Sequence, residues 1–358
     1  MSLTDVNRYA FINAKLRLRI ANMLSDEQIQ HLAASQNLEQ MLHLLKGSAF
    51  EELATLFSES GDIQRLEAWL FARNVDIHRQ VASLLDGVHS IVATQLSRKL
   101  EVENLKGMIR LWFSSRIKAQ NIDYRYGYLY HKKIVSDIDW SAIINAQTFE
   151  ELTHALLHSP YYSVVQQFDA HRITSEGLFF LETALDRQWV SLLRQEARKL
   201  PAVDRHLVQE VLDRDADLKN CINLVRFGYL YALTEAQLRE IMFYGGKLLF
   251  TKEFNDFVTA EPAKRTIEPL LVRLFPQLAK QLAEQNLQGA HRQTIAVESY
   301  LFSQRRSRYK AMLKGYPFTF GTLLSYFFLE ERQHALIRAI INGLHYGYKA
   351  EQIREYAQ

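Results

Sequence analysis

Cysteine, glycine and proline are scarce in this sequence. Its 358 residues include 14 glycines, 6 prolines and one cysteine, Cys221. A single cysteine excludes internal disulfides and is typical of a protein from a reducing compartment. The residues that remain are dominated by the good helix formers Leu, Ala, Glu, Gln, Arg and Lys. This composition favours an all-α fold.

Strong net charge and long apolar runs are also missing. The net charge is only +3, whereas nucleic-acid-binding surfaces usually show a clear basic excess on one face. The longest uncharged stretch of note, residues 316–329, is shorter than the roughly 20 residues that a membrane-spanning helix needs. We therefore expect no nucleic-acid partner and no direct membrane span.

The sequence motifs of common catalytic and cofactor sites are absent as well. The Gly-Gly-Lys at 245–247 lacks the upstream glycine of a phosphate-binding loop, and no GxGxxG or GxSxG is present. His154 and His158 stand at i and i+4, a spacing that presents both rings to one ion. Two histidines underfill a tetrahedral zinc site, and Ala155 occupies the glutamate position of HExxH. We expect no catalytic residue, cofactor or metal, and keep a metal-dependent helical enzyme using His154 and His158 as an alternative.

An apolar stripe with helical spacing recurs three times in the chain, at two equal steps of 116 residues (105 to 221 to 337). The stripe positions are Leu105, Met108, Ile109 and Trp112; Cys221, Leu224, Val225 and Gly228; and Ile337, Ile340, Ile341 and Leu344. Of these, only Gly228 is not apolar. Because Cys221 lies on the stripe, we expect it to be a small core residue.

Two further markers repeat with the stripe. The pattern apolar-Glu-x-x-Leu stands at 66–70, 181–185 and 297–301, and an aromatic residue follows a Leu-rich helix at Phe50, Tyr162 and Phe275. Apolar stripes alone are common in helical proteins, but three markers in one order favour an internal repeat. The sequence therefore predicts three similar helical domains: 1–118, 119–235 and 236–358.

The starts of several helices can be placed in advance. Ser25 is followed by Gln28 three residues later, which is the pattern of a helix-capping box. Residues 37–45 and 148–157 resemble each other and predict a matching helix in the first two repeats. The third repeat has no clean version of this helix, because three prolines interrupt its pattern.

Polar residues accompany the stripes. An acid and an amide stand at i and i+3 on two of the stripe helices: Glu101 with Asn104, and Asp217 with Asn220. Positive charge is added by Lys106, Arg226 and Arg338. Such groups either tie helices together through buried hydrogen bonds or face a shared central axis and contact a partner. The candidate partner-binding residues are Asn104, Lys106, Asn220, Arg226 and Arg338.

The densest basic run lies at residues 304–310. A solvated helix face is the usual role of such a run. Docking of an acidic partner is the less favoured interpretation, because exposed charges mostly tune association rates.

Several segments resemble one known family. They read Tyr-Ala-Phe-Ile-Asn-Ala-Lys-Leu-Arg at 9–17, Glu-Asn-Leu-Lys-Gly-Met-Ile-Arg at 103–110, Asp-Leu-Lys-Asn-Cys-Ile-Asn-Leu-Val-Arg at 217–226, and Leu-Glu-Glu-Arg-Gln-His-Ala-Leu-Ile-Arg-Ala-Ile at 329–340. Their order and spacing resemble the C subunits of the V-type/A-type ATP synthases, whose eukaryotic V-ATPase homologue is the d subunit. The resemblance runs nearly end to end.

The resemblance implies a funnel of three helical domains around a pseudo-threefold axis. It also implies a non-catalytic adaptor in the central stalk of a rotary motor. The partners would be the central shaft subunits and the membrane rotor ring, and the adaptor would couple ATP hydrolysis or synthesis to proton or sodium transport. The chain would be cytoplasmic, attached to the membrane only through the complex, and a monomer in isolation. A generic helical scaffold is the competing interpretation, although solenoids usually stack open-endedly from many units.

Overall fold

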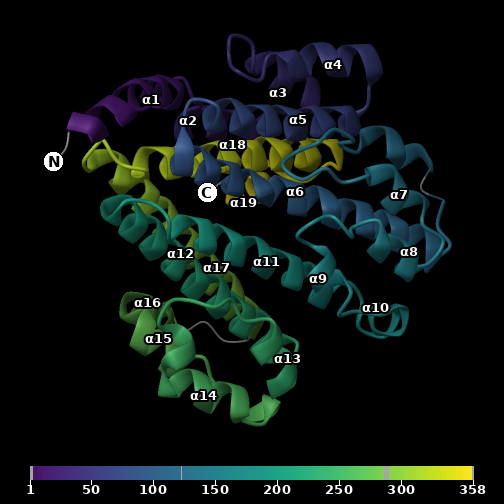
Figure 1. Ribbon diagram of the computed structural model, residues 1–358, viewed down its shortest axis with the longest axis vertical. Helices are drawn as coiled ribbons and strands as arrows, with labels where there is room; N and C mark the ends of the chain where they lie inside the picture. Colours follow the sequence, from purple (N-terminus) through teal and green to yellow (C-terminus); the bar gives the residue numbers. More distant parts are fainter. Residues whose placement is uncertain (1–2, 122, 286–289, 357–358) are drawn as a thin grey trace. The chain divides into compact units, whose positions relative to one another are not determined.

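The computed structural model describes residues 3–121, 123–285 and 290–356, and within these ranges it contains helices and no strand (Figure 1). The all-α prediction is therefore confirmed. Among the helices so described, none is both long enough and apolar enough to cross a membrane. By contact the chain forms two compact units: a first unit of residues 1–162 and 313–358, and a second unit of residues 163–312.

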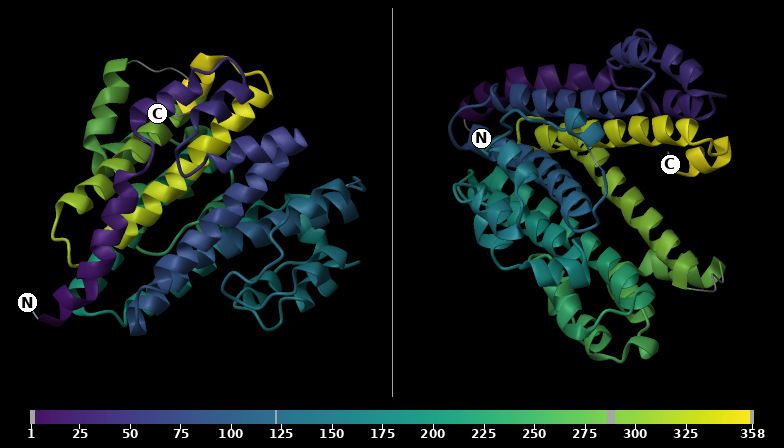
Figure 2. Two further views of the ribbon diagram at one scale, coloured as in Figure 1. Left: turned by 90° about the horizontal axis from the view of Figure 1, so that it is seen from above. Right: turned by 90° about the vertical axis from the view of Figure 1, so that its right-hand side faces the viewer.

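The first unit contains four long helices, α1, α5, α6 and α18, and several short ones. Its elements are α1 (Leu3–Ala21), α2 (Asp26–Ala33), α3 (Leu38–Leu44), α4 (Glu52–Ser60), α5 (Ile63–Ala82), α6 (Gly87–Arg116), the 3-10 helix η1 (Asp123–Tyr128), α7 (Trp140–Asn145), α8 (Phe149–His154), α18 (Gly321–His345) and α19 (Ala350–Tyr356). In Figures 1 and 2 the yellow helix α18 runs along the purple and blue helices α1 and α5, against which it packs.

The second unit has the same mixture of long and short helices. Its elements are α9 (Tyr162–Val165), α10 (Ala170–Glu176), α11 (Phe179–Ala197), α12 (Ala202–Asn223), the π-helical η2 (Leu224–Leu230), α13 (Glu235–Glu240), the 3-10 helix η3 (Leu248–Phe250), α14 (Lys252–Thr259), the 3-10 helix η4 (Pro262–Lys264), α15 (Glu268–Leu274), α16 (Pro276–Gln285) and α17 (Ala290–Lys314). In sequence, α9 and α17 cross the boundary between the units.

Short polar side chains start the short helices, because they satisfy backbone N–H groups that the first turn leaves without a partner. Ser25 and Gln28 form the predicted capping box at α2. The side chains of Asn37 and Thr148 each accept the backbone N–H three residues later at the start of α3 and α8, which confirms the matching helices of the first two repeats. In the second unit, Thr234 forms a second capping box at α13.

The three stripes lie on α6, on α12 with η2, and on α18, and every stripe position is buried except the half-buried Leu344. Cys221 is 1% exposed, as predicted. The exception in the pattern, Gly228, has a steric cause. A Cβ atom there would lie 2.6 Å from a ring carbon of Phe257 on α14, so a larger residue would displace that ring.

The second marker lies on the long helix that precedes each stripe in sequence: α5, α11 and α17. Its apolar and leucine positions are buried in all three. Its glutamate makes equivalent bonds in two of them: Asn342 donates to Glu67 at 2.7 Å, and Arg226 pairs with Glu298 at 2.7 Å. Arg226 and Asn342 are 116 residues apart, which is the step of the stripes. The repeat therefore includes this polar contact as well as the apolar positions.

The third marker needs a correction of one residue. Phe50 is buried, and its equivalent in the second repeat is the buried Tyr161, whereas Tyr162 is half-buried. The turns before them are alike. Ser48 and Ser159 each donate to a carbonyl three residues earlier and accept an N–H two residues later, from Phe50 and Tyr161.

Each stripe helix carries short helices on its buried face. Helix α7 packs on α6, α13 on η2, and both α2 and α3 on α18. Met41 and Leu42 of α3 share one core with Ile337, Ile340 and Ile341 of α18. The first short helices of the chain therefore pack on its last stripe helix. The division into domains 1–118, 119–235 and 236–358 remains a prediction. The two compact units are defined by contacts between residues, and their boundaries differ from those of the sequence repeats.

Candidate functional site

A polar side chain stands one turn before each stripe and accepts backbone N–H groups from the segment that leads toward the short helices. Glu101 accepts from Val135 at 2.7 Å and from Ser136. Asp217 accepts from Lys247 at 3.0 Å and Leu248 at 2.9 Å, and Gln333 accepts from Leu24 at 2.7 Å. Glu101, Asp217 and Gln333 follow the 116-residue step, and we call them the anchor residues.

Glu101 is the most deeply buried anchor, with no exposed surface. Besides the two backbone groups, it accepts from the Tyr161 hydroxyl at 2.8 Å and from Arg98 at 3.1 Å. Burial, followed by the nearby Glu101 carboxylate, holds the pKa of Tyr161 well above its usual range. The hydroxyl therefore stays protonated and keeps its donor role.

The Asp217 anchor explains the Gly-Gly-Lys at 245–247. Gly245 and Gly246 have φ angles of 113° and 74°, and a Cβ on Gly246 would lie 2.2 Å from an oxygen of Asp217. Glycine is needed there for both reasons. Burial raises the pKa of Asp217, while the N–H groups of Lys247 and Leu248 lower it. This turn therefore binds a carboxylate of the protein itself with the kind of N–H groups that a phosphate-binding loop offers to phosphate.

Asn104 and Asn220 lie one turn along the helix from their anchors and are also buried. The Asn104 amide donates to the carbonyl of Tyr130 at 2.9 Å. Asn220 donates to the carbonyl of Phe243 at 2.8 Å and accepts from its N–H at 2.7 Å. These contacts agree with the interpretation in which the polar groups bind backbone within their own unit.

The three candidate cations are more accessible. Lys106 is half-buried, whereas Arg226 and Arg338 are exposed. Arg226 is held by Glu298, and the side chain of Arg226 is still 46% exposed. Lys106 and Arg338 belong to the first unit and Arg226 to the second.

Part of the basic run at residues 304–310 pairs within the second unit. Arg305 bonds to Asp215 at 3.0 Å, Arg308 bonds to Glu210 at 2.9 Å, and the Tyr309 hydroxyl also donates to Asp215. Both acids lie on α12. These cations therefore connect α17 to α12. This role differs from both interpretations of the basic run, a solvated helix face and a docking site for an acidic partner.

His154 and His158 are both exposed. His154 lines a shallow groove with Glu151 and small residues between α7 and α8. Across the described residues, no group of three or more His, Cys, Asp or Glu side chains is placed to hold a metal ion. The alternative of a metal-dependent enzyme gains no support from these residues.

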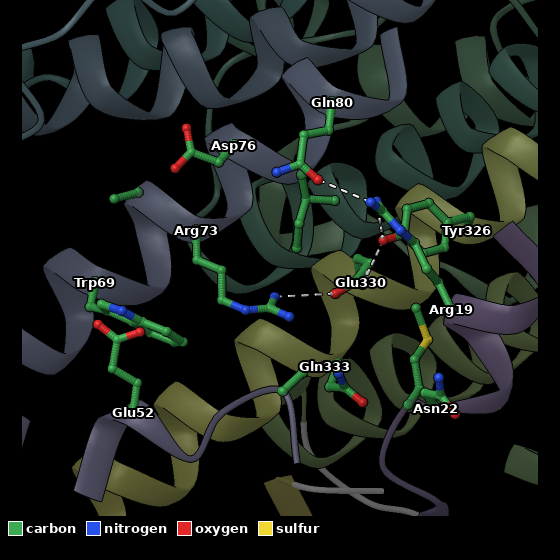
Figure 3. Close-up of a pocket in the computed structure, with 14 residues that line it drawn as sticks. Arg19, Asn22, Glu52, Trp69, Arg73, Asp76, Gln80, Tyr326, Glu330 and Gln333 are labelled. Carbon is green, nitrogen blue, oxygen red and sulfur yellow. Dashed lines mark hydrogen bonds and ion pairs between the residues drawn. The ribbon is translucent and has the colours of Figure 1, made fainter. Parts of the chain in front are cut away.

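A cavity of about 660 Å³ opens in the first unit between α1, α5 and α18 (Figure 3). We call it the arginine cavity. Its lining includes Arg19 of α1, Trp69 and Arg73 of α5, and Tyr326 and Glu330 of α18. Sequence reasoning missed this site, because its residues come from helices that are far apart in the chain and carry no shared motif.

The arginine cavity concentrates charge around one buried carboxyl group. The Tyr326 hydroxyl donates to Glu330 at 2.8 Å and lies 3.4 Å from Arg19, which also donates to Gln80 at 2.9 Å. Arg73 lies 3.9 Å from the other Glu330 oxygen. Burial raises the pKa of Glu330, and the Tyr326 hydrogen bond and Arg73 oppose that shift.

The buried His334 lies beside this group, and a second buried histidine, His78, interacts electrostatically with His334. Burial lowers the pKa of His334 to about 4 and that of His78 to about 3. Neutral His334 therefore donates from Nδ1 to the Glu330 carbonyl at 2.8 Å and accepts at Nε2 from Arg73 at 3.2 Å. His78 stacks on Phe327 with ring centroids 4.0 Å apart.

Known proteins match this chain over nearly its whole length. Residues 12–356 match the model of the family described as ATP synthase (C/AC39) subunit. The C subunit of the A-type ATP synthase of Methanocaldococcus jannaschii is 19% identical over 356 residues, covering 98% of this chain and 86% of the relative. Its counterparts in Thermococcus kodakarensis and Pyrococcus furiosus are 20% and 22% identical over 348 residues, covering 97% of this chain and 90% and 89% of the relatives. Because the family model spans nearly the whole chain, the chain belongs to the family of ATP synthase (C/AC39) subunits.

Proposed function

We propose that this chain is the non-catalytic rotor adaptor of a V/A-type rotary ATPase. It binds the central shaft subunits on one side and the membrane rotor ring on the other. It thereby transmits torque between ATP hydrolysis or synthesis and the transport of protons or sodium ions. The family match over residues 12–356 carries this proposal.

The internal bracing of the helices supports the proposal, because an adaptor must carry torque without deforming. Close-packed interiors have low compressibility and transmit strain. In this chain, hydrogen bonds that the anchor residues accept from backbone N–H groups add to that packing at the same place in each repeat. Three repeats placed around a pseudo-threefold axis, as a funnel, would offer the shaft three equivalent walls.

The shaft contact is proposed to use the polar edges of the stripe helices. Lys106, Arg226 and Arg338 are its exposed or half-buried candidates. Asn104 and Asn220 belong to the same proposal as buried braces of the helices that carry those cations. The chain itself would lie on the cytoplasmic side and reach the membrane only through the ring.

A reconstitution tests the adaptor role directly. The purified chain is mixed with purified shaft subunits and with the detergent-solubilised ring, and the assemblies are weighed by native mass spectrometry. We expect the shaft and ring to associate only when this chain is present, in a complex that contains all three. Shaft–ring association of equal strength without the chain would contradict the adaptor role.

Charge reversal separates contact from bracing at the candidate cations. The double variant Lys106→Glu, Arg226→Glu is expected to fold but to lose shaft binding; because Arg226 also pairs with Glu298, its unfolding temperature should fall somewhat. Normal folding with unchanged shaft binding would remove both residues from the contact. Arg214→Glu, an exposed reversal on α12, is the control for a general charge effect.

A further inference from the structure

We propose that the arginine cavity of the first unit binds an acidic side chain of a partner protein, namely a shaft subunit. The proposal rests on the proposed function, because that function supplies the partner. It names a site on the chain and the chemistry that occupies it: one carboxylate held by Arg19 and Arg73 beside the Trp69 ring.

Arg19 and Arg73 carry more N–H donors than their hydrogen-bond partners use. A guanidinium group carries five N–H donors and suits carboxylates especially well. Arg19 donates one bond to Gln80 at 2.9 Å and a long one to Tyr326, and Arg73 has His334 at 3.2 Å as its hydrogen-bond partner. Neither makes a close ion pair with any carboxylate that the structure describes; the shortest approach is 3.9 Å, from Arg73 to Glu330.

Both guanidinium groups lie against aromatic rings, which orders them before a ligand binds. The Arg73 guanidinium lies over the Phe50 ring at 4.9 Å and the Trp69 ring at 5.8 Å, and the Arg73 side chain is only 22% exposed. Arg19 lies 6.0 Å from the centre of the Tyr326 ring. Stacking on aromatic faces holds a guanidinium in place without consuming its in-plane donors. A ligand therefore meets donors that are already ordered, which lowers the entropic cost of binding.

The arginine cavity holds two arginines and one buried acid. Glu330 is the only buried acid in the lining, and one of its oxygens has no hydrogen-bond partner in the described part of the chain. Burial raises the pKa of Glu330, and the Tyr326 hydrogen bond, Arg73 and Arg19 oppose that shift. The other two acids of the lining, Glu52 and Asp76, are exposed, and Asp76 already pairs with Arg79 at 3.6 Å. One added carboxylate would therefore meet two guanidinium groups whose only buried acidic neighbour in the lining is Glu330.

The arginine cavity is large enough to take a side chain of a partner protein together with its neighbours. A volume of about 660 Å³ lies within the roughly 300–1,000 Å³ of sites that bury drug-sized ligands. A free phosphate or carboxylate ion would fill a small part of it, whereas a side chain with its neighbours would fill much more. Trp69 lines the cavity and is half-buried (Figure 3). Tryptophan and arginine are the residue types that most often dominate protein–protein binding energy.

The test uses the full chain and the purified shaft subunits, with affinity measured by calorimetry. Arg19→Gln and Arg73→Gln are each expected to weaken binding by at least about 30-fold, the effect of losing a strong interface contact. Arg65→Gln is the matched control, because Arg65 is an exposed arginine of α5 outside the cavity lining. It should change the affinity less than about threefold, as surface substitutions do. If Arg73→Gln fails to fold, the shaft affinities of Arg73→Lys and Arg19→Gln test the proposal in its place.

A charge exchange identifies the partner group. Arg73→Glu should abolish binding, and one Asp or Glu of the shaft, changed to Arg, should restore it. If the wild-type chain binds the shaft and both glutamine variants bind it with the same affinity, the cavity proposal is wrong, whereas the adaptor role is unaffected. Failure of the wild-type chain to bind the shaft would overturn the proposed function itself. If millimolar inorganic phosphate stabilises the wild type and not Arg19→Gln, while shaft affinity is the same in both, the cavity is a free-anion site and the proposal is wrong.

Discussion

Glu101 offers the sharpest test of how the repeats are braced. It is fully buried, and four donors surround it: the N–H groups of Val135 and Ser136, the Tyr161 hydroxyl and Arg98. The change Glu101→Ala removes the acceptor of all four. Arg98 is then left half-buried without its carboxylate, although it keeps hydrogen bonds to other side chains.

The expected cost follows from this arrangement. Removing one partner of a buried ion pair costs about 3–5 kcal/mol, because a charge and several polar groups lose their compensation. We expect Glu101→Ala to fall within this range, at about 4 kcal/mol. Glu101→Gln keeps an acceptor and loses the charge, so we expect about 2 kcal/mol, in line with hydrogen bonds to charged groups. The third repeat carries glutamine at the equivalent anchor, Gln333.

The assay is urea denaturation followed by tryptophan fluorescence, since Trp112 and Trp140 are buried in the first unit. The matched control is Glu103→Ala on the same helix, where the side chain is 42% exposed and pairs weakly with Lys99 at 4.0 Å. Such exposed pairs contribute about 0.5 kcal/mol or less. Equal, small effects of Glu101→Ala and Glu103→Ala would refute the anchor argument.

Three further outcomes are expected. Ala119 and Ala232 have φ angles of 51° and 54° just after α6 and η2, a left-handed backbone conformation that strains a residue with a Cβ atom. Replacing either by glycine should raise the free energy of unfolding by about 1 kcal/mol in urea titrations. A lower free energy of unfolding would show that the alanine is not strained. Burial raises the pKa of Cys221 to about 12, so a thiol reagent such as DTNB should label the chain only after unfolding; rapid labelling of the native chain would disprove this. The folded pKa values of His78 and His334, about 3 and about 4, lie below the 6.5 of an unfolded histidine. The unfolded chain therefore binds more protons than the folded chain below about pH 6.5. These two histidines do not reduce the free energy of unfolding above that pH, and they reduce it progressively as the pH falls toward 4. Between pH 6 and 5, His78→Phe should reduce the slope of unfolding free energy against pH by up to about 1.4 kcal/mol per unit, and an unchanged slope would argue against a neutral buried His78.

The sequence predicted the parts of the fold that depend on local pattern. The stripes, the capping box at Ser25 and the core position of Cys221 follow from side-chain period and from local hydrogen bonding. The error at Tyr162 has the same origin. Two adjacent tyrosines fit the pattern equally well, and only the serine turn at Ser159 shows that Tyr161 points inward.

The polar contacts were harder to predict, because their partners are backbone groups in distant segments. Asn104 and its anchor Glu101 bond to residues 130–136, and no side-chain pattern marks that segment as a partner. The third anchor escaped notice because Gln333 replaces an acid. The arginine cavity joins α1, α5 and α18, so it exists only once those helices have packed.

The most direct measurement of the adaptor role is ion pumping in vesicles that contain the rotary ATPase with and without this chain. In vesicles stripped of the chain, ATP hydrolysis by the catalytic sector should continue while ion uptake stops. Adding back the purified chain should restore ATP-driven uptake. Ion uptake at the full rate without the chain would contradict the claim that it transmits torque from shaft to ring.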